Sequence, residues 1–205
     1  MELAVIDFET TGLSAGRDRI IEVGAVILRD GRVAESFVQL MHPGFPIPSF
    51  ITGLTGISNA MVRDMPPPEE VMPRLGQFLD RHPCLAHNAS FDSRFLAAEM
   101  ARAGLGRERP FLCSMRLARR LVPDAPNHRL GTLVQHLGLR PPDGCRAHRA
   151  LDDVLMTVAL WNHLETELAG WLNGKSPDFA FCHRLMTRPK AAAAKLLREA
   201  AVSVP

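Results

Sequence analysis

Two carboxylates stand one residue apart at the end of an apolar run near the start of the chain. Asp7 and Glu9 follow the run from Leu3 to Ile6, and Gly12 comes shortly after them. Because side chains alternate across a strand, both carboxylates point to the same face if the strand continues through them. Like charges this close repel, and each raises the pKa of the other. A well-solvated loop tolerates such a pair, and so does a divalent cation such as Mg²⁺ or Mn²⁺, which prefers oxygen ligands.

Further acids and a histidine lie in two later segments. Asp92 falls near the start of an expected helix, where free N–H groups and the helix dipole should lower its pKa, although helix capping is an alternative role. His148 precedes Asp152 and Asp153, and beside a metal cluster it could deprotonate a water. If the whole segment is helical, Asp152 lies on the same face as His148. Asp153 can lie beside His148 only if His148 precedes the helix, so either acid could be the one that belongs to the site. Together these groups fit a two-metal site for in-line displacement at phosphorus.

The composition is that of a globular protein with one main domain. The chain has 205 residues, of which 46% are hydrophobic and 22% are charged. No apolar run approaches a membrane span, and the start of the chain does not look like a signal peptide. The cysteines are too widely spaced for a zinc site or a disulfide framework: Cys84, Cys113, Cys145 and Cys182. We therefore expect a cytoplasmic protein with reduced, mostly buried thiols.

Charge is unevenly distributed along the chain, although the net charge is only +2. Residues 1–93 carry 7 Lys and Arg against 12 Asp and Glu, whereas residues 94–149 carry 11, all of them arginine, against 4. Arginine can bind phosphate through two parallel hydrogen bonds. The middle segment therefore suits contact with a nucleic-acid backbone, and an ordinary solvated arginine-rich surface is the alternative.

The pattern of apolar residues predicts an α/β domain. Strands are expected over residues 3–7, 20–28, 33–40, 84–86 and 111–114. Helices are expected over residues 66–80, 90–103, 115–121, 130–137 and 150–168. Residues 42–58 read as an ordered loop, and residues 170–205 are weakly patterned, with a helical stretch only over 191–201. Three strands followed by alternating helices and strands predict a mixed sheet with helices packed on it.

Three segments, in this order, resemble the motifs of the DnaQ-like exonucleases. This is the DEDD family, which includes the proofreading epsilon subunit of bacterial DNA polymerase III. "DFETTG" looks like the first motif, "HNASFD" the second, and "HRALDD" fits the H-x-A-x-x-D form of the third. "ITGLTGISNAMV" looks like the loop and helix that follow the third strand in the family, and "NHRLGTLVQHLGL" looks like its helix before the third motif. The resemblance runs from about residue 2 to residue 168.

The resemblance implies the ribonuclease H-like α/β fold, a five-stranded mixed sheet with helices on both faces. The exonuclease domain is expected over residues 1–169. Residues 170–205 are expected to form a C-terminal extension, partly helical, that either docks or stays loosely ordered. Such an extension could bind a polymerase, or it could simply pack on the domain.

The resemblance also implies the site residues. Two divalent ions, Mg²⁺ or Mn²⁺, would be bound by four acidic ligands: Asp7, Glu9, Asp92 and Asp153. His148 would be the general base, and the spacing of the third motif selects Asp153 over Asp152. The other branch of the family has tyrosine in place of this histidine, and the chain contains no tyrosine. The implied reaction is the release of nucleoside 5′-monophosphates from a 3′ end.

Substrate contacts are implied at the first two motifs. The segment that wedges and binds the 3′-terminal nucleotide corresponds to Thr10, Thr11, Gly12 and Leu13. The second motif adds His87, Asn88 and Phe91, although Asn88 could instead bond to the backbone of the turn. Some of the arginines between the second and third motifs are expected to contact phosphate, the candidates being Arg94, Arg116, Arg119, Arg146 and Arg149.

Three functions remain open at this point. "DFETTG" favours a DNA 3′–5′ exonuclease, which either proofreads with a polymerase or stands alone. "HRALDD" also resembles oligoribonuclease, an RNA-trimming enzyme, but that group usually has methionine where this chain has Thr10. A catalytically inactive binding or polymerase-docking module is disfavoured because all five site residues are present. The expected partner is nucleic acid with a free 3′ end, with single-stranded DNA preferred over RNA. Binding to a DNA polymerase subunit and formation of a homodimer are both possible, and no association with a membrane is expected.

Overall fold

A five-stranded mixed sheet forms the centre of the computed structural model, which describes residues 1–106, 109–141 and 148–202. The strand order is β3-β2-β1-β4-β5. The strands are β1 (Leu3–Thr10), β2 (Ile20–Arg29), β3 (Arg32–Leu40), β4 (Cys84–Ala86) and β5 (Phe111–Cys113). The first three are antiparallel neighbours, whereas β4 and β5 run parallel to β1. This is the mixed sheet expected from the sequence.

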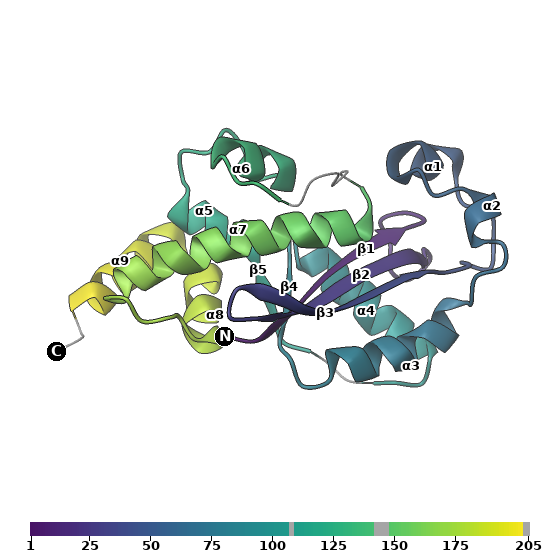
Figure 1. Ribbon diagram of the computed structural model, residues 1–205, viewed down its shortest axis with the longest axis horizontal. Helices are drawn as coiled ribbons and strands as arrows, with labels where there is room; N and C mark the ends of the chain where they lie inside the picture. The colour runs from purple at the N-terminus through teal and green to yellow at the C-terminus, as the bar shows by residue number, and fades with distance from the viewer. Residues whose placement is uncertain (107–108, 142–147, 203–205) are drawn as a thin grey trace.

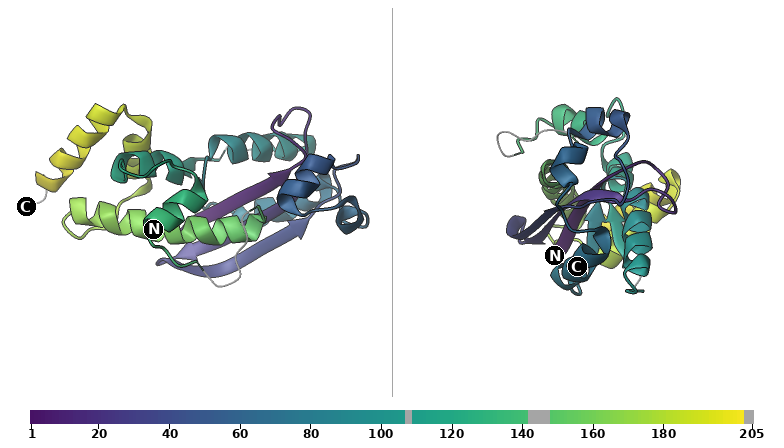
Figure 2. Two further views of the ribbon diagram at one scale, coloured as in Figure 1. Left: turned by 90° about the horizontal axis from the view of Figure 1, so that it is seen from above. Right: turned by 90° about the vertical axis from the view of Figure 1, so that its right-hand side faces the viewer.

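Helices cover both faces of the sheet (Figure 1, Figure 2). The long helix α7 (Ala150–Trp171) lies along β1 and β2 on one face, and α5 (Ser114–Leu121) and α6 (Leu130–His136) pack against it. On the other face, α3 (Pro68–Leu79) and α4 (Ser90–Arg102) pack against each other and the sheet. Because both faces are covered, β1 and β2 are buried almost throughout and read as apolar runs.

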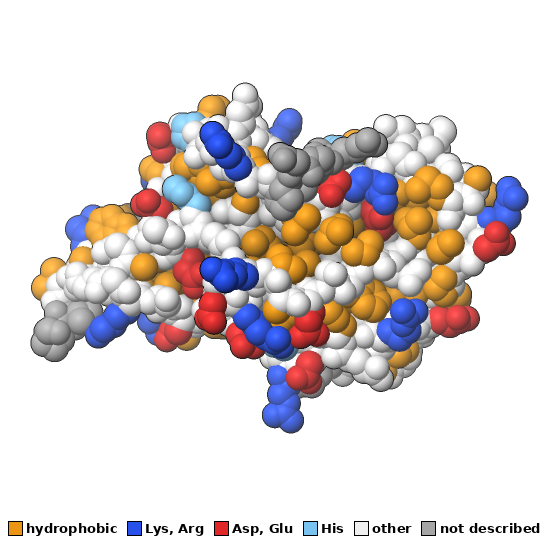
Figure 3. All heavy atoms as spheres, in the orientation of Figure 1, with side chains coloured by type: hydrophobic (Ala, Val, Ile, Leu, Met, Phe, Trp, Pro, Cys, Tyr) orange, Lys and Arg blue, Asp and Glu red, His pale blue; other side chains and the backbone are white. Residues whose placement is uncertain are grey.

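β3 is an edge strand that is largely exposed. Figure 3 shows hydrophobic side chains across the middle and right of the face that carries α7, with charged side chains along its lower edge. Val33 and Val38 on β3 are among the exposed large hydrophobic residues. Strand β3 pairs with β2 along its length, so the central strand β1 and its acidic end are separated from this edge.

The loop expected over residues 42–58 is partly helical, so that expectation was wrong in part. Helix α1 (Ser49–Thr55) lies inside this range, and α2 (Asn59–Val62) follows directly after it. A small separate core explains the helices, and its buried members are Ile21, Ile47, Ile51, Ile57 and Val62. Burial of these side chains against β2 outweighs the weak helix propensity of a segment rich in Gly, Pro, Ser and Thr.

The C-terminal segment is helical and packs on the main core. It forms α8 (Phe179–Thr187) and α9 (Lys190–Val202). Asp178 caps α8 by accepting a hydrogen bond from the Phe181 N–H at 2.6 Å. The residues of these helices buried in the main core are Phe181, Cys182, Leu185, Met186, Ala193 and Leu197.

The described thiols match the expectation. Cys84, Cys113 and Cys182 are free and buried, and Cys145 lies outside the described residues. Burial raises the pKa of the Cys84 and Cys182 thiols to about 12. None of the helices in the described ranges combines the length and the apolar character that a membrane span requires.

Helix α7 begins directly on the backbone of β2 at Gly24. A Cβ atom at this position would lie 2.5 Å from the Ala150 carbonyl carbon and 2.5 Å from the Leu151 amide nitrogen. Gly24 is paired with Asp7 across the two strands. The absence of a side chain at Gly24 therefore brings the start of α7 close to the acidic end of β1.

Gly24→Ala is expected to lower the free energy of unfolding by about 1–3 kcal/mol, because the new methyl group must push the start of α7 away from the sheet. Urea unfolding followed by circular dichroism measures this change. The matched control is Gly53→Ala inside α1, where a Cβ meets nothing within 4 Å and alanine favours the helix by about 0.5–1 kcal/mol. An equal effect of both variants would show that the close approach at Gly24 is not a constraint.

Candidate active site

The end of β1 carries the first two acids of the site. Asp7 lies opposite Gly24 and Glu9 lies opposite Glu22 in the antiparallel pairing of β1 with β2. Residues paired in this way point to the same face of a sheet, so Asp7 and Glu9 share the face that α7 covers. Strand β1 continues to Thr10, which meets the condition on which the shared face depended.

Asp92 contributes a third acid from the first turn of α4. Its side chain is 2% exposed, and no described residue hydrogen-bonds to its Oδ1 atom. Burial raises the pKa of Asp92 to about 8, although backbone hydrogen bonds from Asp92 itself and from Phe8 act in the opposite direction. The expected downward shift was therefore wrong, because loss of hydration outweighs the favourable position at the helix start.

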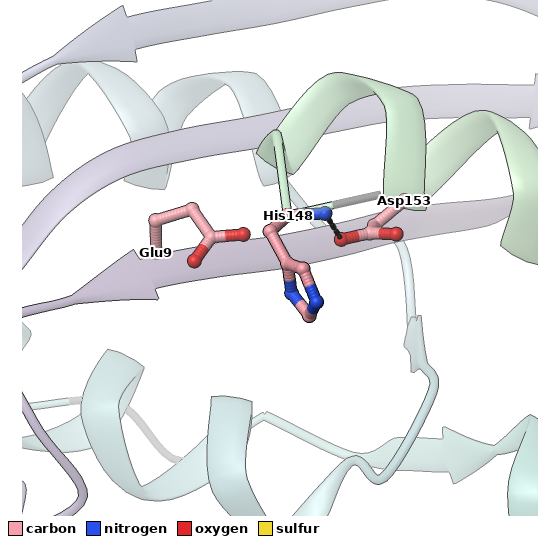
Figure 4. A group of neighbouring side chains, drawn as sticks. All are labelled: Glu9, His148 and Asp153. Carbon is pink, nitrogen blue, oxygen red and sulfur yellow. Dashed lines mark hydrogen bonds between the residues drawn. The ribbon is translucent and has the colours of Figure 1, made fainter. Parts of the chain in front are cut away.

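The third motif brings His148 and Asp153 to the same place. His148 lies before α7 in a left-handed backbone conformation, with φ of 66°, and its N–H donates to Asp153 Oδ2 at 3.0 Å. The helix begins at Ala150, so the condition under which Asp153 can join His148 is met. One ligand atom from each of Glu9, His148 and Asp153 lies within 4.8 Å of the other two (Figure 4).

These acids raise one another's pKa values in the protein without metal. Burial raises the pKa of Asp7 well above its usual value, and the charges of Asp92, Asp153 and Glu9 add to this. Burial, followed by the charge of Asp153, raises the pKa of Glu9 to about 8. Burial also raises the pKa of Asp153, although its hydrogen bond from His148 opposes this.

The residues present fit a hard divalent cation. Carboxylate oxygens are the ligands that Mg²⁺ and Mn²⁺ prefer, and four such groups converge here. The unpartnered Oδ1 atom of Asp92 is also explained by a ligand that it would bind. Such a cation would keep the acids ionised, and its binding would release protons.

A cavity of about 690 Å³ lies beside these acids and extends toward the segment that leads into α6. Five residues expected from the motifs line it: Asp7, His87, Asn88, His148 and Asp153. The other wall of the cavity includes Met115, His128, Arg129 and Met156. His128 and Arg129 belong to the segment "NHRLGTLVQHLGL", which resembles a family element, but no role at the site was predicted for any of these four residues.

His87 holds the wall of this cavity together. Its Nδ1 atom lies 2.9 Å from Ser114 Oγ, and its Nε2 atom lies 3.0 Å from the carbonyl oxygen of His128. Burial lowers the pKa of His87 to about 4, so the ring is neutral near pH 7. Both ring nitrogens already have partners within the protein, so His87 would contact a substrate through the carbon atoms or the face of its ring.

The other two residues expected from the second motif differ in their surroundings. Asn88 is exposed in a left-handed conformation, with φ of 66°, and its carbonyl oxygen accepts a hydrogen bond from the Phe91 N–H at 2.9 Å. Phe91 packs on Phe95, with 4.7 Å between the ring centroids. Asn88 thus shapes the turn through its backbone, and its exposed side chain faces the cavity region that it lines.

The loop after β1 is braced so that Leu13 projects from it. Thr10 Oγ1 donates to the carbonyl oxygen of Gly12 at 2.6 Å, and Thr11 Oγ1 donates to Asp18 at 3.3 Å. A Cβ atom at Gly12 would lie 2.6 Å from the Asp18 carboxylate oxygens, so a side chain there would displace the carboxylate that Thr11 Oγ1 and the Ser14 N–H bind. Leu13 itself is 81% exposed.

An ion pair between Arg19 and the buried Glu99 holds the end of the same loop against α4. Arg19, at the end of the loop, donates from Nε to Glu99 Oε1 at 2.8 Å and from Nη2 to Glu99 Oε2 at 3.1 Å. Glu99 is fully buried on α4 and also pairs with Arg102, which donates to the Ala15 carbonyl oxygen at 2.8 Å. The helix that carries Asp92 therefore also fixes the loop that carries Leu13.

The expected phosphate-contacting arginines have varied partners. The guanidinium of Arg149 forms an ion pair with Glu22 of β2, so its charge already has a partner within the protein. Arg94 donates to the Ser90 carbonyl oxygen, and Arg119 contacts Met115 Sδ at 3.7 Å. Arg116 is exposed, and Arg146 lies outside the described residues. Arg129, which was not among the candidates, lines the cavity.

Comparison with known proteins identifies the family. The sequence matches the RNase_T family model, described as Exonuclease, over residues 4–161. The chain belongs to the DnaQ-like exonuclease family. The resemblance drawn from the three motifs and the ribonuclease H-like fold are thereby confirmed, and so is the enzyme class at the level of the family.

Two curated relatives of this family member are PolC-type DNA polymerases III. The one from Caldanaerobacter subterraneus subsp. tengcongensis is 38% identical over 160 residues, which cover 78% of this chain and 11% of the relative. The one from Clostridium perfringens is 38% identical over 159 residues, with the same coverage of 78% and 11%. This exonuclease-family chain thus spans about a ninth of the length of these relatives.

Solved structures show the same fold in this family. Exonuclease X in complex with 5′ overhanging duplex DNA is 33% identical, has a TM-score of 0.66, and is matched over 80% of this chain and 91% of its own. E. coli Exonuclease I in complex with a dT13 oligonucleotide has a TM-score of 0.71 at 18% identity, over 84% of this chain and 42% of its own. The second likeness speaks for the fold alone.

The stability of the metal-free protein is expected to fall as the pH rises from about 6.5 to about 8. In this window Glu9 and Asp92 are ionised in the unfolded chain, but their pKa values are raised to about 8 in the folded one, so the folded state binds more protons. His87 does not contribute there, because its lowered pKa matters only below its ordinary value of 6.5. Urea unfolding in EDTA at several pH values measures the slope.

Mn²⁺ should reduce this pH dependence, because it stabilises the ionised acids of the folded protein. The control is Asp92→Asn, which removes one of the titrating groups and should flatten the slope without metal. A stability that is constant or rising over the window in EDTA would contradict the raised pKa values.

Proposed function

We propose that this protein is a metal-dependent 3′–5′ exonuclease that releases nucleoside 5′-monophosphates from DNA 3′ ends. One observation carries the proposal in this member of an exonuclease family: Asp7, His148 and Asp153, from the first and third motifs, line one cavity. Glu9 lies close to His148 and Asp153, and the charge of Asp92, from the second motif, acts on Asp7. Asp7, Glu9, Asp92 and Asp153 would hold two divalent ions, Mg²⁺ or Mn²⁺. When bound, such ions activate water and neutralise charge on the leaving oxygen.

The position of His148 supports the proposal that it is the general base. It is exposed beside the cavity, and its backbone N–H is held by Asp153. We propose that its ring takes a proton from the attacking water as the water oxygen bonds to phosphorus. The P–O bond to the 3′ oxygen of the preceding nucleotide breaks, which leaves a nucleoside 5′-monophosphate and, after protonation by solvent, a 3′-hydroxyl on the shortened strand.

The 3′-terminal nucleotide would be bound between the loop after β1 and the cavity. The exposed side chain of Leu13, on a loop braced through Thr11 and Gly12, suits a wedge between the last two bases. Thr10 and Phe91 lie in the motifs that flank this place, and His87 and Asn88 line the cavity. DNA is preferred over RNA in this proposal because the related Exonuclease X is in complex with duplex DNA and Exonuclease I is in complex with a dT13 oligonucleotide.

The assembly in which the protein works is also a proposal. The PolC-type relatives favour association with a DNA polymerase, whereas the near-complete match to Exonuclease X favours a stand-alone enzyme, either monomeric or as a homodimer. Free buried thiols at Cys84, Cys113 and Cys182 suit a cytoplasmic enzyme. Light scattering and co-purification with polymerase subunits distinguish these assemblies.

The proposed activity predicts metal-dependent laddering from the 3′ end of 5′-labelled single-stranded DNA. An RNA of equal sequence is tested in the same assay. Addition of EDTA, or the substitution Asp7→Ala, which removes one proposed metal ligand, should abolish cleavage of both strands. Faster cleavage of RNA would replace the DNA proposal with an RNA-trimming enzyme. Tight binding of both strands by a folded protein without turnover would instead indicate an inactive binding module.

His148→Ala should lower kcat by about 100-fold or more while the Kd for single-stranded DNA changes little, because the base acts only in the chemical step. Single-turnover kinetics and fluorescence anisotropy measure the two quantities. Asp152→Ala is the control for Asp153→Ala: the neighbour lies outside the group of close ligand atoms and should cost much less. The reverse order would show that Asp152 is the ligand.

A further inference from the structure

Glu22 is a buried acid that the proposed chemistry does not use. It is the third residue of the apolar strand β2 and is 1% exposed. Its Oε1 atom accepts a hydrogen bond from Arg149 Nη2 at 2.8 Å, and its Oε2 atom accepts one from Arg149 Nε at 3.2 Å. The Ala150 N–H donates to Oε2 at 3.0 Å. One carboxylate thus binds both the side chain and the backbone at the start of α7.

These contacts replace a cap that α7 does not supply itself. Arg149 is the N-cap residue of α7, and its side chain makes no capping hydrogen bond. The free N–H groups of a first helical turn are normally satisfied by a nearby acceptor in the sequence. Here the acceptor comes from another strand, so the position of the helix start is tied to the sheet.

The place where Glu22 holds α7 is next to the proposed metal ligands. Glu22 pairs with Glu9 across β1 and β2, and Gly24, two residues further along β2, contacts the backbone of Ala150. His148 and Asp153 lie on either side of the anchored residues, Arg149 and Ala150. A shift of the helix start would therefore move His148 and Asp153 relative to Glu9.

We propose that Glu22, through Arg149 and the Ala150 N–H, is a positioning residue that holds His148 and Asp153 in register with Glu9 for metal binding. The inference rests on the proposed metal site and deepens it. Residues that orient metal ligands without touching the metal typically change metal affinity by about 10- to 100-fold when they are removed. A buried ion pair adds little net stability, whereas its two parallel hydrogen bonds fix a direction.

A different physical cause predicts the opposite result for one variant. If Glu22 acted only through its negative charge, removing the positive charge of Arg149 would strengthen cation binding, because Arg149 lowers the pKa of Glu9 and opposes the cation. If the pair positions α7, Arg149→Met weakens cation binding, because the helix start is released. The sign of the change therefore separates positioning from charge.

The experiment uses the full chain as Glu22→Gln, as Arg149→Met and as the double variant that carries both. Titration with Mn²⁺ in a calorimeter gives the affinity without reference to nuclease activity. Positioning predicts about tenfold weaker Mn²⁺ binding in each single variant and no recovery in the double variant, since both changes break one interaction. Charge alone predicts tighter binding in Arg149→Met and recovery in the double variant, which restores the net charge.

Two further readouts test the same proposal. Hydrogen exchange in EDTA should be faster at the first turn of α7 in the variants, and kcat should fall while KM for the oligonucleotide changes by less than about twofold. The matched controls are Glu35→Gln and Arg29→Met, which break a surface pair of 3.0 Å at the other end of β2 and β3 and should change none of these quantities.

The outcomes separate this inference from the proposed function. Wild-type protein that binds Mn²⁺ but does not cleave DNA would refute the nuclease activity, and the Mn²⁺ affinities of the variants would still decide the role of Glu22. Unchanged affinity and unchanged exchange in Arg149→Met and Glu22→Gln would overturn the positioning role. If Glu22→Gln fails to fold, Arg149→Met, whose side chain is 41% exposed, decides the question alone.

Discussion

The burial of four mutually repelling carboxylates at one end of β1 is the constraint on which the rest of the site depends. Each of Asp7, Glu9, Asp92 and Asp153 has a raised pKa, and burial is the largest cause for every one of them. Arg149 lowers the pKa of Glu9, but its guanidinium is already paired with Glu22. Near pH 7 a bound cation would therefore favour the ionised form of these acids, which is the physical reason for proposing a metal site here.

The strands and the long helices could be predicted from the sequence because their apolar patterns are local. Strand β4 has the expected bounds. Strand β1 was expected to end at Asp7, but it continues past Glu9 to Thr10. Helix α1 could not be predicted in the same way. Only Ile51 and Thr55 of its residues are buried, and one pair at i, i+4 is too little to establish a helical period. The core that Ile51 joins includes Ile21 on the distant strand β2. The docking of α8 similarly depends on the distant core.

The candidate ligands could be predicted from the sequence because each motif places them a few residues apart, whereas their surroundings could not. The raised pKa of Asp92 depends on its burial at the start of α4. Glu22 and Arg149 are 127 residues apart, and His87 and His128 are 41 apart. One signal for Glu22 was present, a lone charge within the apolar run of β2, and a charge in such a place must have a partner.

Two buried glutamates hold the parts of the site in the same way. Glu99 binds Arg19 at the end of the loop that carries Leu13, and Glu22 binds Arg149 at the start of the helix that carries Asp153. In each case the carboxylate comes from a rigid helix or strand, and the arginine comes from a segment without regular structure at that point.

Burying a carboxylate costs several kcal/mol, roughly what a well-made pair returns, so stability alone gives little reason to keep such pairs. A guanidinium fixed by two parallel hydrogen bonds, however, defines both distance and direction. The pairs therefore act on geometry: they hold two segments, far apart in sequence, at fixed positions around the acids of the site.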